Sequence, residues 1–281
     1  MASSRPLHDA PERSYAGKLE RFARFIAPEL RSLFGDLAVP PAARVLDLGC
    51  GVGIATRLLA DLLDRDSRVV GVDLSLPHLR AARGLREHAS RWRDVSLLQA
   101  DAGQLCFRDG SFDLIWSCNT VNHLSDPVAA LTGLRAALRP EGRVVLAQSG
   151  FLPEMYFAWD APLDDAVRRA CHDYYRDRYD LEIEDTAGIR GLIRLLQRAG
   201  LRVGRVRTIV IERVQPLTEV DCAYFEEAVF RGTWGERLRP FLSREHWQAL
   251  CNYTDPASPG YCLDREDFHH LQTLTVCVGH A

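Results

Sequence analysis

The sequence predicts an α/β fold: a doubly wound, mostly parallel seven-stranded sheet with helices on both faces, an N-terminal helical cap and helical lid insertions. Two observations support this. From Arg44 to Gln148, short apolar runs typical of buried strands alternate with segments of helical periodicity. Such alternation requires crossover helices, which connect parallel strands. In addition, a glycine-rich turn, Gly49–Gly53, directly follows the first predicted strand.

The elements follow in a regular order. One amphipathic helix is expected from Tyr15 to Phe34, because apolar residues recur there at helical spacing, and Pro40 closes it. Later helices are expected from Ile54, after a Ser75 cap, and over 126–138 and 189–198. The seven expected strands are 44–48, 68–73, 95–100, 112–117, 144–148, 206–214 and 271–278.

We divide the chain into residues 1–41, an N-terminal segment with the cap helix, and residues 42–281, one large domain. The alternation breaks at two places, where lid insertions are expected at about 151–186 and 215–268. The second insertion is expected to be mostly helical, with its aromatic residues forming a lid core or a subunit contact rather than a cofactor site. These residues are Phe225, Phe230, Trp234 and Trp247.

The composition excludes several classes of protein. With 47% hydrophobic residues, 26% charged residues and a formal net charge of -3, the chain resembles ordinary soluble proteins and has no basic field for nucleic acid. No apolar run approaches the roughly 20 residues that span a membrane. The eight cysteines form no C-x-x-C pair, so free thiols and no metal site are expected. Because the N-terminus has no apolar core of a signal peptide, we expect a cytoplasmic protein. We also expect a monomer or a homodimer.

The glycine turn has the pattern Asp47-x-Gly49-x-Gly51-x-Gly53. Nicotinamide and flavin folds need a further glycine where Ile54 stands, and a P-loop needs Lys and Ser or Thr after its glycines, so neither matches. A carboxylate at the strand end would also repel a diphosphate. The turn therefore suits a ligand that carries an ammonium group and no phosphate, which disfavours a nicotinamide-dependent oxidoreductase.

Two more carboxylates stand at strand ends, where ligands bind in open α/β sheets. Asp73 can accept two hydrogen bonds from a ribose diol, and Asp101 can accept one from an adenine amine. Leu74 and Ala102 are placed to pack on the faces of the adenine ring. The alternatives are that Asp73 only caps the next helix and that Asp101 is only a turn residue. Together these positions predict a pocket for an adenosine with a zwitterionic tail.

Five segments resemble the successive motifs of the class I S-adenosylmethionine-dependent methyltransferases, which have a Rossmann-like fold. They occur in the expected order between residue 42 and about residue 149. One departure is Glu141-Gly142, where Gly-Gly is commoner. The segments are Val45–Gly53, Val70–Ser75, Asp101, Phe107–Leu114 and Leu138–Arg143.

The resemblance implies S-adenosylmethionine as cofactor and S-adenosylhomocysteine as product, and it is silent on the acceptor. Because a complete cofactor site is followed by two insertions that are not specific to one family, we expect a small-molecule acceptor methylated on O or N in a biosynthetic pathway. The resemblance implies that the glycine loop, with Cys50, approaches the methionine part, and that Asp73 holds the ribose. It also implies that Asp101 meets the adenine amine and that the backbone near Cys118 and Asn119 meets the methionine amino group. A nonmethylating relative, which binds the cofactor for another reaction or for a partner, stays open as an alternative.

The acceptor site is less defined. His123 lies just past the fourth strand and could be a general base, although a His-Leu pair at this place is common in the family whatever the acceptor. Aromatic walls with a few polar groups suit a planar or cationic molecule, and the alternative is that most of these residues pack the lid itself. The candidate acceptor-binding residues are Tyr15, Asn119, His123, Tyr156, Trp159, Asp160, His172, Tyr174 and Tyr175.

Overall fold

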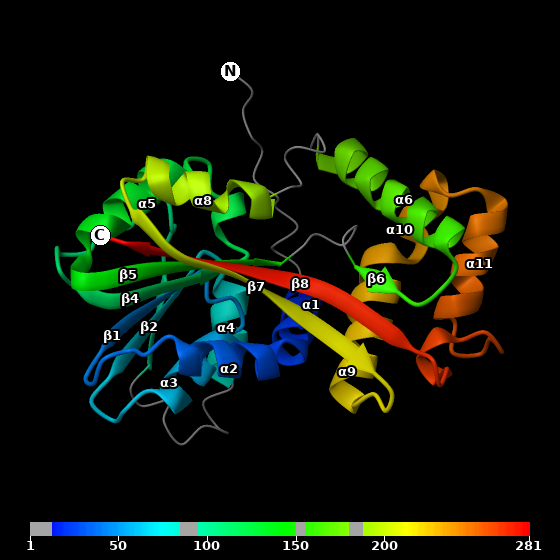
Figure 1. Ribbon diagram of the computed structural model, residues 1–281, viewed down its shortest axis with the longest axis horizontal. Helices are drawn as coiled ribbons and strands as arrows, with labels where there is room; N and C mark the ends of the chain where they lie inside the picture. The colour runs from blue at the N-terminus through cyan, green and yellow to red at the C-terminus, as the bar shows by residue number, and fades with distance from the viewer. Residues whose placement is uncertain (1–12, 85–94, 150–154, 180–187) are drawn as a thin grey trace. The chain divides into compact units, whose positions relative to one another are not determined.

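The chain forms two compact units in the computed structural model (Figure 1). Strands β7 (Arg202–Val214) and β8 (His269–His280) each contribute to both units. The structure describes residues 13–84, 95–149, 155–179 and 188–281. Unit 1 comprises Met1–Gln148, Gly188–Ile209 and Thr275–Ala281, and unit 2 comprises Ser149–Ala187 and Val210–Leu274.

The sheet confirms the predicted doubly wound topology. Its strand order is β3-β2-β1-β4-β5-β8-β6, with β7 paired to β8, and all the pairs from β3 to β5 are parallel. All seven predicted strands form, and an eighth, the short strand β6 (Tyr156–Phe157), pairs antiparallel to β8. The five parallel strands are β1 (Arg44–Leu48), β2 (Arg68–Asp73), β3 (Val95–Gln99), β4 (Phe112–Cys118) and β5 (Leu138–Ser149).

Helices cover both faces of the sheet in unit 1 (Figure 1). Helices α5 and α8 pack together on one face, while α2 packs on α3 on the other, and α1 contacts α3 and α4. A 3-10 turn, η3 (Val121–His123), follows β4. The helices are α1 (Arg13–Phe25), α2 (Ala27–Asp36), α3 (Ile54–Leu62), α4 (Leu76–Gly84), α5 (Pro127–Ala136) and α8 (Gly188–Arg198).

The central strands are mostly apolar because both of their faces are covered. Leu46, Ile115 and Leu146 are fully buried in the core that α5 and α8 close. On the opposite face, the ring of Trp116 meets that of Phe34 edge-on at 4.8 Å between centroids. This double burial fixes β1 and β4 in the middle of the sheet, so their carboxyl ends lie side by side.

The prediction of a single N-terminal helix is wrong, because the structure has two helices in this region. Helix α1 ends at Phe25 and α2 begins at Ala27, with Pro28 in the first turn of α2. Proline has no N–H and its ring clashes with the carbonyl four residues earlier, so it is tolerated only in a first helical turn. The apolar periodicity continues across Ile26, which is why the break is hidden in the pattern.

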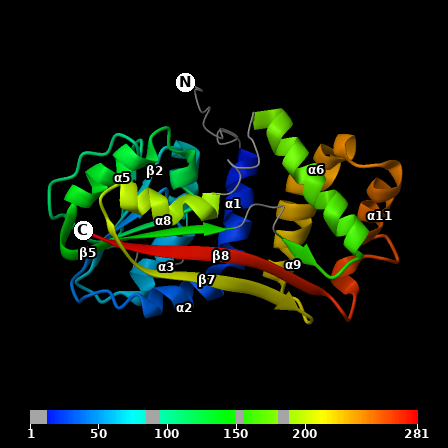
Figure 2. The same ribbon diagram turned by 45° about the horizontal axis from the view of Figure 1, so that its top comes forward.

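Unit 2 is mostly helical, as expected for the insertions. Helix α6 packs against α10 and α11, and Figure 2 shows α6 and α11 side by side. A continuous helical segment changes to π-helical hydrogen bonding in η5, a rare geometry. The elements are α6 (Ala161–Tyr179), α9 (Glu219–Ala223), η5 (Tyr224–Trp234), α10 (Gly235–Leu238), η6 (Arg239–Phe241), α11 (Arg244–Thr254) and η7 (Cys262–Asp264).

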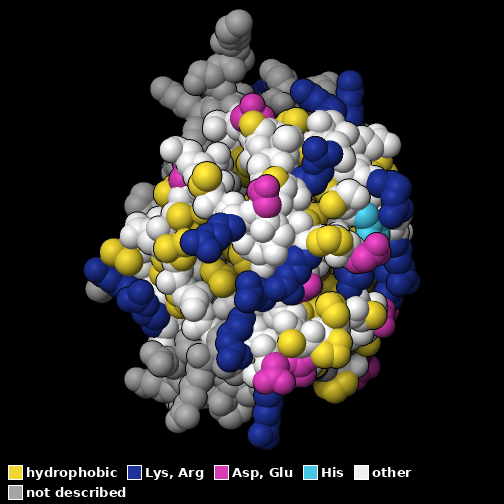
Figure 3. Space-filling view, turned by 90° about the vertical axis from the view of Figure 1, so that its left-hand side faces the viewer, with side chains coloured by type: hydrophobic (Ala, Val, Ile, Leu, Met, Phe, Trp, Pro, Cys, Tyr) yellow, Lys and Arg dark blue, Asp and Glu magenta, His cyan; other side chains and the backbone are white. Residues whose placement is uncertain are grey.

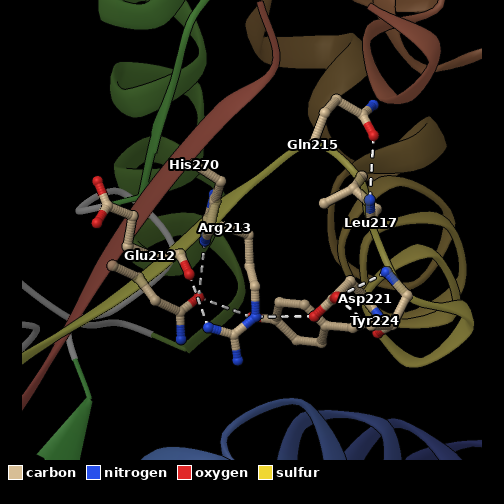
Figure 4. Close-up of polar contacts among 9 residues, drawn as sticks. Glu212, Arg213, Gln215, Leu217, Asp221, Tyr224 and His270 are labelled. Carbon is tan, nitrogen blue, oxygen red and sulfur yellow. Dashed lines mark hydrogen bonds and ion pairs between the residues drawn. The ribbon is translucent and has the colours of Figure 1, made fainter. Parts of the chain in front are cut away.

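A polar cluster is buried in unit 2 (Figure 4). The Arg213 Nε donates to Asp221 Oδ1 at 2.8 Å, and these side chains are only 13% and 9% exposed. The Tyr224 hydroxyl donates to Gln272 Oε1 at 3.0 Å. Burial lowers the pKa of His270 to about 3, so its ring is neutral at neutral pH. These hydrogen bonds join β7 to α9 and β8 to η5, which continues α9.

The Lys and Arg side chains on the face shown in Figure 3 are spread among apolar and acidic ones. Among the ion pairs of the described residues, Arg139 pairs with Asp113 at 2.8 Å. The eight cysteines are free thiols. No helix in the described part of the chain has the length and apolar character needed to cross a membrane.

The Glu141 position yields a stability prediction. Glu141 has a φ of 67°, a left-handed conformation that costs a non-glycine residue roughly 1–2 kcal/mol, whereas glycine loses about 0.5–1 kcal/mol more entropy on folding. We expect Glu141→Gly to raise the free energy of unfolding in urea by about 0.5–1 kcal/mol. Gly142→Ala is the contrasting control, because its Cβ would lie 2.8 Å from the Arg139 carbonyl oxygen. A less stable Glu141→Gly protein would contradict this account.

Candidate functional site

The glycine loop bends tightly at the carboxyl end of β1. Gly49, Gly51 and Gly53 have φ angles of 74°, 54° and 80°, which favour glycine. A Cβ on Gly49 would lie 2.1 Å from the Thr120 hydroxyl oxygen, so only glycine fits there. The Gly49 N–H donates to the Val72 carbonyl at 2.8 Å. The loop is therefore held between the ends of β2 and β4.

Asp47 lies beneath this loop, with only 2% of its surface exposed. Its Oδ2 accepts a hydrogen bond of 2.6 Å from the Thr56 hydroxyl of α3. Burial raises the pKa of Asp47 to about 7, against the effect of the Thr56 hydrogen bond, and the negative charge of Asp73 adds to the rise. A cation bound nearby would favour the ionised carboxylate. The site thus suits a positively charged ligand group.

Asp73 connects the glycine loop to the end of β2. Its Oδ2 accepts a hydrogen bond of 2.8 Å from the Gly51 N–H. Its Oδ1 accepts one of 2.8 Å from the Ser75 N–H, and the His78 Nδ1 lies 3.3 Å from the same oxygen. Because each carboxylate oxygen can accept two hydrogen bonds, Oδ2 retains capacity for a ligand hydroxyl. The carboxylate therefore helps to start α4 and can also face a ligand.

Asp101 follows β3 and is exposed. Its carboxylate accepts hydrogen bonds from the Gly103 N–H at 2.8 Å and from the Gln104 side chain at 3.0 Å, so it does stabilise its own turn. Lone pairs remain on both oxygens for a further donor. Leu74 is 57% exposed at the end of β2, while Ala102 is half-buried and packs against the core. Because β2 and β3 are paired and parallel, Leu74 and Asp101 follow neighbouring strand ends at the same edge of the sheet, which suits an amine-bearing ring.

The residues at the end of β4 also border the site. Burial, together with the negative charge of Asp47, raises the pKa of Cys118 to about 12, so it remains a thiol. Asn119 adopts a left-handed φ of 53°, which asparagine tolerates, and its N–H donates to the Ala147 carbonyl at 2.9 Å. The Thr120 hydroxyl donates to the Cys118 carbonyl at 3.0 Å. These bonds turn the chain back over the glycine loop.

Besides Asn119, the candidate acceptor residues of unit 1 lie on two elements, α1 and η3. His123 is half-buried in η3, and its N–H donates to the Thr120 carbonyl at 2.9 Å. Tyr15 belongs to α1, but its side chain lies outside what the structure describes. The same helix approaches the loop, since Leu19 Cδ1 lies 3.8 Å from the place where a Gly51 Cβ would stand. Helix α1 therefore covers part of the glycine loop.

The other candidates belong to unit 2, and several contact its own helices. Trp159 stacks on Phe157 at 4.7 Å between centroids and donates to Asp164 at 3.3 Å. Asp160 accepts from the Leu163 N–H at 2.9 Å and so caps α6. These contacts match the alternative of lid packing, and a role in acceptor binding stays a prediction. The remaining candidates are Tyr156, which is 47% exposed, and the half-buried His172, Tyr174 and Tyr175.

The sequence did not indicate the residues that support the carboxylates. Thr56 follows Asp47 by nine positions, and a hydroxyl on the otherwise apolar buried face of α3 was the available signal. His78, only 4% exposed on α4, gave the same kind of signal. Gln104 holds Asp101 from within its own turn. Among the described residues, no cluster of His, Cys, Asp and Glu is suited to hold a metal ion.

Known proteins share this sequence pattern and fold. Residues 46–146 match the family described as "Methyltransferase domain". The demethylmenaquinone methyltransferase of Beutenbergia cavernae is 32% identical over 181 residues, which are 61% of this chain and 71% of that protein. The malonyl-[acyl-carrier protein] O-methyltransferase of Pseudescherichia vulneris is 38% identical over 131 residues, or 46% of this chain and 49% of the relative.

The chain covers about half the length of several of these relatives, including 49% of the Pseudescherichia protein. Among solved structures, the YcgJ protein of Bacillus subtilis matches with a TM-score of 0.52 at 15% identity, over 90% of this chain and 98% of the other. That likeness concerns the fold alone.

Asp47→Asn should remove a pH-dependent loss of stability. The pKa of Asp47 is about 7 in the folded protein but 3.8 ordinarily, so the free energy of unfolding falls as the carboxyl ionises between those values. We expect the free energy of unfolding of the variant, relative to that of the parent, to rise by a few kcal/mol from about pH 4 to 8. The reason is that one pKa unit is worth about 1.4 kcal/mol. Urea titrations of the two proteins at each pH measure this difference in the free energy of unfolding. Asp36→Asn, which changes an exposed carboxylate, is the control. A difference that stays constant with pH would contradict the assignment.

Proposed function

Because the chain belongs to the class I S-adenosylmethionine-dependent methyltransferases, we propose that it transfers a methyl group from S-adenosylmethionine to an O or N atom of a small-molecule metabolite, in a biosynthetic pathway. The observation that carries this proposal is the link between Asp73 and the Gly51 N–H at 2.8 Å. It sets a carboxylate and a bent glycine loop beside each other at one sheet edge.

The residues of unit 1 fit this cofactor. When bound, S-adenosylmethionine supplies an activated methyl group on a positively charged sulfur. Asp73 would hold the ribose hydroxyls, while Asp101 and Leu74 would hold the adenine amine and ring. The loop at Gly51 would take the methionine part, with its amino group near the Cys118 carbonyl. The carboxylates of Asp47 and Asp73 give this edge the negative charge that a cation needs.

Catalysis then depends mainly on positioning. Transfer to an aligned acceptor is an in-line displacement, and pre-alignment can lower a barrier by roughly 7–11 kcal/mol. A base is needed only if the acceptor must lose a proton, and His123 is the candidate at the end of η3. The name of the Beutenbergia relative, a demethylmenaquinone methyltransferase, supports a small-molecule acceptor. The name of the Pseudescherichia relative gives a malonyl group on an acyl-carrier protein, so the acceptors of the two relatives differ.

A labelled-methyl assay tests the proposed function. The purified chain is incubated with S-adenosylmethionine labelled in its methyl group and with panels of phenols, carboxylic acids and amines. We expect labelled product together with S-adenosylhomocysteine. Failure to bind the cofactor in calorimetry would contradict the proposal. Cofactor binding with conversion of an acceptor that gains no label would instead support a nonmethylating relative.

Asp73→Ala should weaken binding of S-adenosylhomocysteine. Loss of the acceptor leaves ribose hydroxyls unpaired, which costs about 1–3 kcal/mol. Titration calorimetry measures the change. The matched control is Asp36→Ala, which removes an exposed carboxylate of α2 that pairs with Arg207 at 2.7 Å. If the Asp73 variant bound S-adenosylhomocysteine as tightly as the parent, the assignment of Asp73 to the ribose would be contradicted.

Cofactor affinity should also depend on pH. With a pKa of about 7, Asp47 is mostly protonated below neutrality, and a bound sulfonium or ammonium favours its ionised form. We expect affinity for S-adenosylmethionine to fall by up to about tenfold per pH unit below pH 7, since each proton taken up must be released on binding. Calorimetry of the parent and of Asp47→Asn at each pH isolates this effect. If the affinities of the two proteins changed with pH in the same way, ionisation of Asp47 would not be coupled to ligand binding.

A further inference from the structure

His78 is an unusual residue for its position. It lies on the inward face of α4, where it is 4% exposed and its neighbours Leu79 and Ala82 are also buried. A side chain with two polar nitrogens is costly to bury unless it makes hydrogen bonds. Its Nδ1 lies 3.3 Å from Asp73 Oδ1. The imidazole thus contacts the carboxylate that we assign to the ribose.

The bonds around Asp73 divide between its two oxygens. Oδ1 is approached by the Ser75 N–H at 2.8 Å and by the His78 imidazole, so its two lone pairs are used. Oδ2 accepts only the Gly51 N–H among the contacts described above. Because a carboxylate only accepts hydrogen bonds, the Nδ1 of His78 is the donor. The capacity left for a ligand is therefore on Oδ2.

The backbone of His78 is itself fixed. Its N–H donates to the Ser75 hydroxyl at 3.4 Å in the first turn of α4, and the Leu79 N–H donates to the Ser75 carbonyl at 3.1 Å. The imidazole therefore reaches Asp73 from a helix and not from a free loop. A support on a regular element holds a binding group more accurately than one on a loop.

We propose, on the basis of the proposed function, that His78 is a positioning residue for the ribose site. Its imidazole donates to Asp73 Oδ1, prevents rotation of the carboxylate, and keeps Oδ2 directed to the ribose hydroxyls. His78 thereby sets the preference of the site for a ribose over a deoxyribose. A side chain that merely filled the core would affect both sugars equally.

The test compares two ligands in calorimetry: S-adenosylhomocysteine and its 2′,3′-dideoxy analogue. We expect His78→Leu to weaken binding of the first by about threefold to tenfold, the low range for a hydrogen bond of this length, and that of the second by less than twofold. His78→Asn, whose amide nitrogen stands near the place of Nδ1, should restore the preference. His78→Gln, whose amide matches Nε2 instead, should not. In an Asp73→Ala background, His78→Leu should have no further effect.

Equal losses for both ligands, or equal behaviour of the Asn and Gln variants, would overturn this role. The Asn and Gln comparison stands even if His78→Leu does not fold. If the parent protein binds neither ligand, the proposed function fails first. If the parent binds S-adenosylhomocysteine and every His78 variant keeps its preference for the ribose, only the inference about His78 fails.

Discussion

The hydrogen bond from the Gly51 N–H to Asp73 Oδ2, 2.8 Å long, joins the glycine loop to the neighbouring strand. It depends on the sheet order, because β1 and β2 are adjacent and parallel and their ends align at Leu48 and Val72. Parallel strands present their carboxyl ends at one edge, where ligands bind. The loop, the carboxylate and the end of β4 therefore form one site of short segments, each held by a buried strand.

The same arrangement concentrates negative charge in a poorly solvated place. Burial of Asp47, together with the charge of Asp73, raises the pKa of Asp47 to about 7 and so weakens the folded protein when the carboxyl ionises. A positively charged ligand relieves this cost. The protein thus retains a locally unfavourable arrangement that favours the bound state, which is common at functional sites.

The strands and the three carboxylates could be predicted because their signals are local: apolar runs, a glycine turn and a strand end. The bonds from Thr56 to Asp47 and from His78 to Asp73 could not, because each joins two elements whose packing a linear pattern does not fix. The break at Pro28 was hidden by apolar residues on both sides. In unit 2, Trp159 packs with Trp234, 75 positions later in the chain, so its surroundings lay beyond any local pattern.

We assign cofactor binding to residues of unit 1, whereas the sequence could only suggest which residues contact the acceptor. The position of the bound adenosine is the central point, and a crystal structure with S-adenosylhomocysteine tests it most directly. We predict ribose hydroxyls within hydrogen-bonding distance of the Asp73 carboxylate and the adenine beside Leu74. A ribose bound away from Asp73, or an Asp73 carboxylate turned from the ligand, would contradict this assignment.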